Sequence, residues 1–234
     1  MTVSIVIPCY NEAATVAMVI ERVLAADTRG LEKDIVVVDD GSTDESIAAV
    51  EALAKREPRV RLLRHDANRG KGAAIRTGFA AATGEIVLVQ DADLEYDPQD
   101  YSKLLEPIVS GRADVVYGSR FKGGESTRVL YFWHMIGNKM LTLLSNMLTD
   151  MNLTDMETCY KVFRADILKK IILVEDRFGF EPEITAKICR LRPRPRLYEV
   201  GVAYAGRTYD EGKKITWRDG LSALRCILRY NLLP

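Results

Sequence analysis

The sequence has no excess of charge of either sign, because 33 Lys and Arg residues stand against 33 Asp and Glu residues. A balanced chain has no strong overall field, so we expect no nucleic-acid partner, and any phosphate must be bound by a local basic cluster. Of the 234 residues, 47% are hydrophobic and 28% are charged. Such a chain can bury a sizeable core, which excludes a disordered chain, a collagen-like chain and a small disulfide scaffold.

Cysteine is scarce and its arrangement is not that of a metal or redox site. The four cysteines are Cys9, Cys159, Cys189 and Cys226, with no C-x-x-C pair among them and no histidine at ligand spacing. Structural zinc sites and dithiol motifs need closely spaced ligands. We therefore expect buried free thiols.

Targeting signals and long hydrophobic runs are also missing. The first four residues lack the basic region of a secretory signal peptide, and the apolar run that follows stops at Pro8. The most apolar long stretch, residues 129–149, contains His134 and Lys139. It falls short of the roughly 20 apolar residues that a membrane-spanning helix needs. We therefore expect a cytoplasmic protein that does not span a membrane.

The usual glycine-rich nucleotide loops are absent as well. Residues 70–72 read Gly-Lys-Gly, but Ile75 stands where a dinucleotide fingerprint has its third glycine, and G-x-x-x-x-G-K-[ST] does not occur. Those glycines let the backbone approach phosphates closely. The sequence thus disfavours both a Rossmann dehydrogenase and a P-loop NTPase.

Short solid apolar runs alternate with stretches of helical period in the first half of the chain. The runs predict strands over residues 3–7, 35–38, 60–64, 86–89 and 114–118. Asn11 is a candidate cap for the first helix, and Ser42 and Glu45 have the spacing of a capping box for the second. The pattern predicts an α/β fold with a mainly parallel central sheet flanked by helices.

The second half predicts further helices in the same domain. Residues 129–151, 166–173 and 217–233 have a helical pattern, and residues 197–205 alternate like a strand. No linker, repeat or abrupt change of composition interrupts the chain, so we expect one domain over residues 1–234. The apolar residues 129–149 suit an interfacial helix that meets a lipid, and they suit a core or dimer helix equally well.

Acidic residues follow two of the predicted strands. Asp91, Asp93 and Glu95 come after the fourth strand, and Asp39 follows the second. The carboxyl ends of parallel strands share one edge, where open α/β folds bind ligands. Carboxylates there can hold a divalent cation on a nucleotide diphosphate, although a capped turn with exposed acids would look the same.

The ordered motifs of the chain resemble those of inverting glycosyltransferases of family 2. The motifs are Ile7-Pro8-Cys9-Tyr10-Asn11-Glu12, Val38-Asp39-Asp40-Gly41-Ser42-Thr43-Asp44, Asn68-x-Gly70-Lys71-Gly72 and Asp91-Ala92-Asp93-Leu94-Glu95. Gly118-Ser119-Arg120, residues 154–164 and residues 206–214 are similar to the polyprenyl-phosphate (dolichol-phosphate) mannose and glucose synthase branch. The resemblance implies a single domain of the GT-A type, with a Rossmann-like nucleotide-sugar half over residues 1–120 and an acceptor half over residues 121–234.

The resemblance also implies roles for individual residues. The positions that match the nucleotide-sugar site are Pro8, Tyr10, Glu12, Asp39, Lys71, Asp91, Ala92 and Asp93. Those that match basic positions near the acceptor phosphate are Arg120, Arg207 and Lys213, and the catalytic positions are Asp93, Arg120 and Asp155. Asp93 and Glu95 match the ligands of a divalent metal, Mg²⁺ or Mn²⁺. Cys159 stands where the family often has glycine. Because glycine adopts conformations that other residues rarely adopt, the backbone conformation near Asp155 could differ from that of the family.

The implied reaction moves a hexose from UDP-glucose or GDP-mannose to a polyprenyl phosphate, with inversion and with a divalent metal. A phosphate monoester has a second pKa of about 6, so near neutral pH it is already a nucleophile that needs no strong base. Asp155 then positions the sugar or the basic residues, whereas a hydroxyl acceptor would make it a general base.

Alternatives to this reaction stay open. They are a family 2 transferase to a soluble or polysaccharide hydroxyl, and a non-catalytic subunit that binds nucleotide sugars. The lipid acceptor implies a peripheral position at the cytoplasmic face of a membrane. The sequence does not decide the donor, the acceptor chain length, the metal, a membrane subunit or a homo-oligomer.

Overall fold

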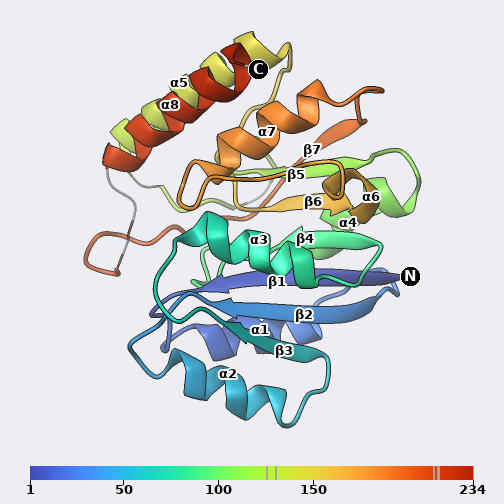
Figure 1. Cartoon of the computed structure of the whole chain (residues 1–234), viewed down its shortest axis with the longest axis vertical. Helices are drawn as coiled ribbons and strands as arrows, with labels where there is room; N and C mark the ends of the chain where they lie inside the picture. Colours follow the sequence, from blue (N-terminus) through green and yellow to red (C-terminus); the bar gives the residue numbers. More distant parts are fainter. Residues whose placement is uncertain (125, 130, 213, 215–216, 234) are drawn as a thin grey trace.

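A seven-stranded sheet runs through the molecule in the order β3-β2-β1-β4-β6-β5-β7 (Figure 1). The computed structural model describes residues 1–124, 126–129, 131–212, 214 and 217–233. The strands are β1 (Thr2–Cys9), β2 (Glu32–Asp39), β3 (Val60–Arg64), β4 (Ile86–Val89), β5 (Val115–Ser119), β6 (Lys161–Arg164) and β7 (Leu197–Gly201). β6 pairs antiparallel with β4 and β5, and the remaining pairs are parallel. The predicted α/β fold with a mainly parallel sheet is confirmed.

Helices cover both faces of this sheet. They are α1 (Val16–Ala25), α2 (Ser46–Ala54), α3 (Lys71–Ala81), α4 (Tyr101–Val109), α5 (Phe132–Thr149), α6 (Ala165–Leu168), α7 (Phe180–Arg190) and α8 (Trp217–Leu232), with the short 3-10 helix η1 (Pro98–Asp100) before α4. The helices α5 and α8 lie side by side at the end of the molecule far from β3, and both pack on α7 (Figure 1). This pair stands above the half of the sheet that contains β5 and β7.

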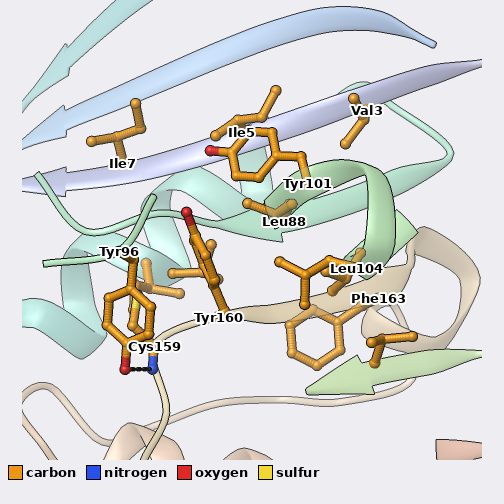
Figure 2. Close-up of a cluster of buried hydrophobic side chains, with 14 of the residues drawn as sticks. Val3, Ile5, Ile7, Leu88, Tyr96, Tyr101, Leu104, Cys159, Tyr160 and Phe163 are labelled. Atoms are coloured by element: carbon orange, nitrogen blue, oxygen red, sulfur yellow. Dashed lines mark hydrogen bonds between the residues drawn. The ribbon is translucent and has the colours of Figure 1, made fainter. Parts of the chain in front are cut away.

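The strands bury alternate residues on opposite faces. Val3, Ile5 and Ile7 of β1 belong to the main core, together with Tyr101 and Leu104 of α4 (Figure 2). A second cluster, made of Val36, Val38 and Ala74, lies on the side that α3 covers. Period-two alternation in β1 and β2 therefore anchors helices on both sides of the sheet.

A buried polar network fixes the chain where it leaves β4. Gln90 directly follows this strand, and its Oε1 accepts hydrogen bonds from the hydroxyls of Tyr101, at 2.7 Å, and Tyr160, at 2.8 Å. Nearby, the backbone N–H of Cys159 donates to the hydroxyl of Tyr96 at 3.2 Å (Figure 2). Because buried polar groups need partners, this network holds the segment after β4 in one position.

Two predictions about cysteines and membranes can be compared with the structure. Cys9, Cys159, Cys189 and Cys226 are buried and free, as the sequence predicts. None of the helices within the described ranges has both the length and the apolar character needed to cross a membrane.

The predicted helix caps after β1 and β2 are wrong. Helix α1 begins at Val16, and Asn11 has a φ of 50°, outside the helix. The α2 N-terminus has Glu45 at the cap position without a side-chain bond. Instead, the backbone N–H of Asn11 donates to the Ser42 hydroxyl at 2.9 Å, and Asn11 Oδ1 accepts from the Thr43 N–H at 2.8 Å. Asn11 and Ser42 thus bond across to the other loop rather than to their own helices, which brings the two loops together.

Several boundaries also differ from the sequence prediction. β1 continues through Pro8, which still pairs with Val38 of β2. On the other side of β1 the pairing with β4 ends at Val6, so a residue without an N–H group is tolerated there. The predicted helix over residues 166–173 shrinks to α6, and the strand over 197–205 ends at Gly201. The helix predicted over 129–151 is α5, and the one over 217–233 is α8.

Candidate active site

The carboxyl ends of β1, β2, β4 and β5 share one edge of the sheet, and the predicted site residues gather there. Glu12, Asp39, Asp91 and Arg120 each lie within three residues of the end of one of these strands. β6 enters the sheet antiparallel, so the residues before it, including Asp155, approach the same edge from the other direction. The topology therefore brings together residues that are far apart in the sequence.

Arg207 joins the two acidic segments of this edge. Its guanidinium donates to both oxygens of Glu12, at 3.1 and 3.0 Å, and to Asp93 Oδ2 at 3.2 Å. Its backbone N–H donates to Glu95 Oε1 at 2.7 Å. Lys214 Nζ adds a bond of 2.8 Å to Glu12 Oε1. Burial opposes the guanidinium charge, but the surrounding carboxylates raise the pKa of Arg207 above its usual range.

Asp93 lies at the most negative part of this cluster. Burial, together with the charges of Asp91 and Glu95, raises the pKa of Asp93 to about 7 against the opposing effect of Arg207. The neighbouring negative charges that help to raise this pKa also attract a cation, which would take the place of the proton. The segment from Asp91 to Glu95 is thus suited to a positively charged ligand.

Lys71 is the basic residue closest to Asp91. Its Nζ lies 2.8 Å from Asp91 Oδ1 and 3.6 Å from Glu181 Oε1. Although burial opposes its charge, Asp91 holds the pKa of Lys71 well above its usual value. Lys71 begins α3 directly after Gly70, which has a φ of 103°, a conformation that favours glycine.

Asp40 shapes this loop, and sequence reasoning did not give it a role. Its carboxylate accepts hydrogen bonds from the backbone N–H groups of Arg69, at 3.0 Å, and Gly70, at 2.7 Å. His65 Nδ1 lies 2.7 Å from the same carboxylate. The acidic pair Asp39-Asp40 was visible in the sequence, but only the structure shows that its second member positions Lys71 through the backbone.

Asp155 and Arg120 form a buried ion pair. Nε and Nη2 of Arg120 each lie 2.7 Å from a different Asp155 oxygen, and the Arg120 backbone N–H adds a bond of 3.0 Å. Glu199 accepts from the backbone N–H of Asp155 at 3.1 Å, and the Arg120 guanidinium stands 5.2 Å from the centre of the Tyr204 ring. A carboxylate with both oxygens bonded to one arginine is held in place and poorly placed to take up a proton.

Cys159 does not distort the chain near Asp155. It is not among the described residues with positive φ, so the position that often has glycine in the family adopts an ordinary backbone conformation here. Its N–H is bonded to Tyr96, as described above. The cysteine at this position therefore requires no unusual backbone conformation next to Asp155.

The remaining predicted donor residues lie around β1 and β2. Asp39 accepts from the Ser42 N–H at 3.1 Å through Oδ2, whereas its buried Oδ1 has no hydrogen-bond partner in the described part of the chain. The Ala92 carbonyl accepts from Thr15 at 2.8 Å. Pro8 and Tyr10 stand at the end of β1, where the Tyr10 ring is partly exposed, with its centre 5.7 Å from Lys214 Nζ. Lys213 lies outside the described residues.

A cavity of about 1040 Å³ opens beside these groups. Its charged lining residues are Lys71, Asp91, Glu95, Arg120, Arg128, Glu157, Glu181 and Asp219. Its aromatic and apolar lining residues include Phe121, Tyr131, Phe132, Trp133, Leu141 and Trp217. His134 in α5 also lines it and lies 2.7 Å from the Tyr209 hydroxyl, through Nε2. A ligand that carries both a phosphate and a hydrocarbon chain suits a lining of this mixed character.

Few side chains at this edge of the sheet could ligate a metal ion. No group of three or more His, Cys, Asp or Glu side chains in the described ranges has the arrangement of a metal site. The predicted ligands Asp93 and Glu95 supply two carboxylates. Mg²⁺ is usually bound by one or two carboxylates together with substrate phosphates rather than by an all-protein cage. The residues present therefore fit a divalent cation that is shared with a diphosphate.

Comparison with known proteins gives one family and one fold. A family model described as "Glycosyl transferase family 2" matches residues 4–172. An undecaprenyl-phosphate 4-deoxy-4-formamido-L-arabinose transferase of Edwardsiella ictaluri is 30% identical over 213 residues, which cover 90% of this chain and 62% of the relative. A dodecaprenyl-phosphate galacturonate synthase of Rhizobium johnstonii is 27% identical over 215 residues, 91% of this chain and 62% of that protein. The chain thus spans 62% of the length of these two relatives.

A solved structure resembles the whole chain. It is glucosyl-3-phosphoglycerate synthase from Mycobacterium tuberculosis, in complex with Mn²⁺, UDP and phosphoglyceric acid. The TM-score is 0.77 at 20% identity, and the match covers 100% of this chain and 79% of that one. This likeness confirms the expected GT-A type of fold.

Proposed function

The chain belongs to glycosyl transferase family 2, and we propose that it transfers a hexose from a nucleotide diphosphate sugar to a polyprenyl phosphate. The observation that supports this acceptor is the cavity, which is lined both by charged residues, among them Lys71 and Arg120, and by aromatic and apolar residues of α5 and α8. The names of the relatives refer to undecaprenyl and dodecaprenyl phosphate, which supports the same acceptor class. Residues 1–120 would form most of the donor site and residues 121–234 most of the acceptor site.

On the donor side, Asp39 and the end of β1 bind the base and ribose. The free Oδ1 of Asp39 supplies a hydrogen-bond acceptor for them. Pro8, Tyr10 and Glu12 line the same end, and Lys71 lies near the diphosphate beside Asp91. UDP-glucose and GDP-mannose are the donors to test first. UDP is also the nucleotide in the solved M. tuberculosis structure.

Asp93 and Glu95 would hold a divalent ion, Mg²⁺ or Mn²⁺. When bound, such an ion neutralises negative charge on the leaving diphosphate. We assign Arg207, Lys213 and Arg120 to the second anion, because an acceptor phosphate must approach a diphosphate that is itself negative. Arg207 can do this because its guanidinium already stands beside Asp93.

The acceptor phosphate oxygen attacks the anomeric carbon and forms a new C–O bond from the face opposite the leaving group. The bond between that carbon and the diphosphate oxygen breaks, and the nucleotide diphosphate leaves, so the configuration inverts. No proton has to be removed, because the phosphate monoester is largely a dianion above its second pKa of about 6. Asp155 positions Arg120 in this reaction, in agreement with its two bonds to the guanidinium.

A hydroxyl acceptor is the alternative within the same family. It would require a general base, and the ion pair with Arg120 leaves Asp155 poorly placed for that role. A non-catalytic subunit that only binds nucleotide sugars is the alternative outside catalysis. A lipid acceptor also places the protein at the cytoplasmic face of a membrane, as part of the same proposal.

The experiment compares acceptors and donors directly. Purified protein, Mg²⁺ or Mn²⁺ and labelled UDP-glucose or GDP-mannose are incubated with polyprenyl phosphate, with the matching polyprenol, or without lipid. Label in the organic phase that depends on the phosphate supports the proposal and identifies the nucleotide. Label on the polyprenol or on an aqueous glycan favours the hydroxyl acceptor, and binding without turnover favours the non-catalytic subunit.

A further inference from the structure

Two carboxyl groups in the cavity have no part in the reaction described above. Glu157 stands two residues after Asp155, and Glu181 lies in the first turn of α7. Both line the cavity, as do Lys71 and Arg120. Sequence reasoning assigned neither of them a role.

Each of these side chains has a buried oxygen that lacks a partner. Glu157 Oε1 and Glu181 Oε2 have no hydrogen-bond partner within the part of the chain that the structure describes, and Glu181 is only 4% exposed. An unsatisfied buried polar atom costs free energy of about 1–3 kcal/mol, so each of these oxygens needs a partner that the described residues do not supply. Both atoms belong to side chains that line the same cavity.

The cations near the pair already have partners. Lys71 lies between Asp91 and Glu181, at 2.8 and 3.6 Å, and Arg120 is bonded to Asp155. Lys161 Nζ donates to the carbonyl of Met156 at 3.0 Å and to that of Thr158. Within the described ranges, neither Glu157 Oε1 nor Glu181 Oε2 accepts a hydrogen bond from these side chains.

Close acidic groups in a buried place hold a proton. Burial and the charge of Glu181 raise the pKa of Glu157 to about 8, although Lys161 and Arg120 act in the opposite direction. Near neutral pH, such a pair offers both a hydrogen-bond donor and hydrogen-bond acceptors. A sugar hydroxyl, which both donates and accepts, is complementary to it.

We propose that Glu157 and Glu181 bind hydroxyl groups of the transferred sugar and restrict the donor to uncharged sugars, excluding uronic acids. The inference rests on the proposed function and specifies its donor class. A uronic acid would place a further carboxylate against this pair where the dielectric constant is low and nearby cations are already engaged.

The test measures binding and needs no turnover. Isothermal titration calorimetry with UDP and with GDP, in the presence of Mg²⁺, first identifies the nucleotide. The hexose and uronate forms of that nucleotide are then compared: UDP-glucose with UDP-glucuronic acid, or GDP-mannose with GDP-mannuronic acid. We expect the wild type to bind the hexose form at least about tenfold more tightly.

Variants then assign the effect to the pair. The double variant Glu157→Gln/Glu181→Gln removes the negative charge that the pair shares, so the preference for the hexose form, compared with the same variant's affinity for UDP or GDP, should fall by about tenfold. Glu51→Gln on α2, outside the cavity, is the matched control and should keep the preference. Thermal unfolding of each variant checks that it is folded.

The outcomes separate this inference from the proposed function. If the wild type binds hexose and uronate forms equally, or if folded variants keep the full preference, the selectivity assigned to Glu157 and Glu181 is wrong and the transfer reaction is unaffected. If neither UDP nor GDP binds, the proposed function fails and this inference fails with it.

Discussion

Arg207 forms an ion pair with Asp93, with 3.2 Å between Nη2 and Oδ2, although the two residues are 114 positions apart in the sequence. The same guanidinium binds Glu12. A basic side chain from the 206–212 loop therefore touches carboxylates at both ends of the acidic edge. A divalent ion at Asp93 and Glu95 must compete with Arg207 for the same oxygens.

Replacing Arg207 should strengthen metal binding and weaken transfer. In Arg207→Gln, Asp93 and Glu95 lose their positive neighbour, so we expect Mn²⁺ to bind about tenfold more tightly in the absence of nucleotide. Titration followed by the electron paramagnetic resonance signal of free Mn²⁺ measures this affinity. Arg112→Gln, on an exposed ion pair with Glu106, is the control. An unchanged Mn²⁺ affinity in Arg207→Gln would show that the two cations do not compete.

Breaking the buried ion pair should cost both stability and activity. Asp155 is fully buried and bonds to Arg120 through both oxygens, so Asp155→Asn leaves the guanidinium without its counter-charge. Removing one partner of a buried pair typically costs about 3–5 kcal/mol of unfolding free energy. Urea unfolding measures the loss, and the transfer assay should show little product. Wild-type stability together with normal transfer would mean that Asp155 does not position Arg120.

Glu157 should make the protein less stable as the pH rises. Its pKa is raised from 4.5 to about 8 in the folded state, first by burial and then by Glu181. The folded state therefore keeps a proton that the unfolded state releases, and the stability gained below pH 4.5 is lost as the pH rises toward 8. In Glu157→Gln this loss disappears, so its Tm should fall less than that of the wild type between pH 6 and pH 8. Parallel Tm curves for the two proteins would contradict the raised pKa.

The apolar side chains that line the cavity should affect the KM for long acceptors and leave the KM for short ones nearly unchanged. Trp133 is 78% exposed and Trp217 is 72% exposed, and both line the cavity. Trp133→Ser and Trp217→Ser remove apolar surface that a long chain would cover, so the KM for a long polyprenyl phosphate should rise about tenfold or more. The KM for geranyl phosphate should change little. Ile172→Ser, at a position that is 80% exposed and does not line this cavity, is the control. Equal effects on both acceptors would mean that Trp133 and Trp217 do not contact the hydrocarbon chain of the acceptor.

The strands β1 to β5 and the acidic edge could be predicted from the sequence because they depend on local patterns. Solid apolar runs correctly indicated β1 to β5, and the motifs after them indicated Asp39, Asp91 and Asp93. The partners of these residues could not be predicted. The Arg120–Asp155 pair and the contacts of Arg207 depend on how the antiparallel β6 and the 206–212 loop return to the sheet edge.

The helix caps, strand β6 and the two acidic residues of the cavity could not be predicted correctly from local sequence patterns. Asn11 and Ser42 are good helix-cap residues, but each bonds across to the other loop, a contact between segments 31 residues apart. Strand β6 has only four residues and follows a polar motif, so its period is too short to recognise. Glu157 and Glu181 were hidden because single acidic residues are common on surfaces, and only the fold buries these two beside each other's charge.

The central claim is that the acceptor is the phosphate of a polyprenyl chain, and ³¹P NMR tests it most directly. Polyprenyl phosphate, Mg²⁺ and the donor that binds are incubated with the protein. The account predicts that the phosphate monoester signal is replaced by a phosphodiester signal as the nucleotide diphosphate appears. A persisting monoester signal, with nucleotide diphosphate and sugar released or with sugar attached to a hydroxyl, would contradict it.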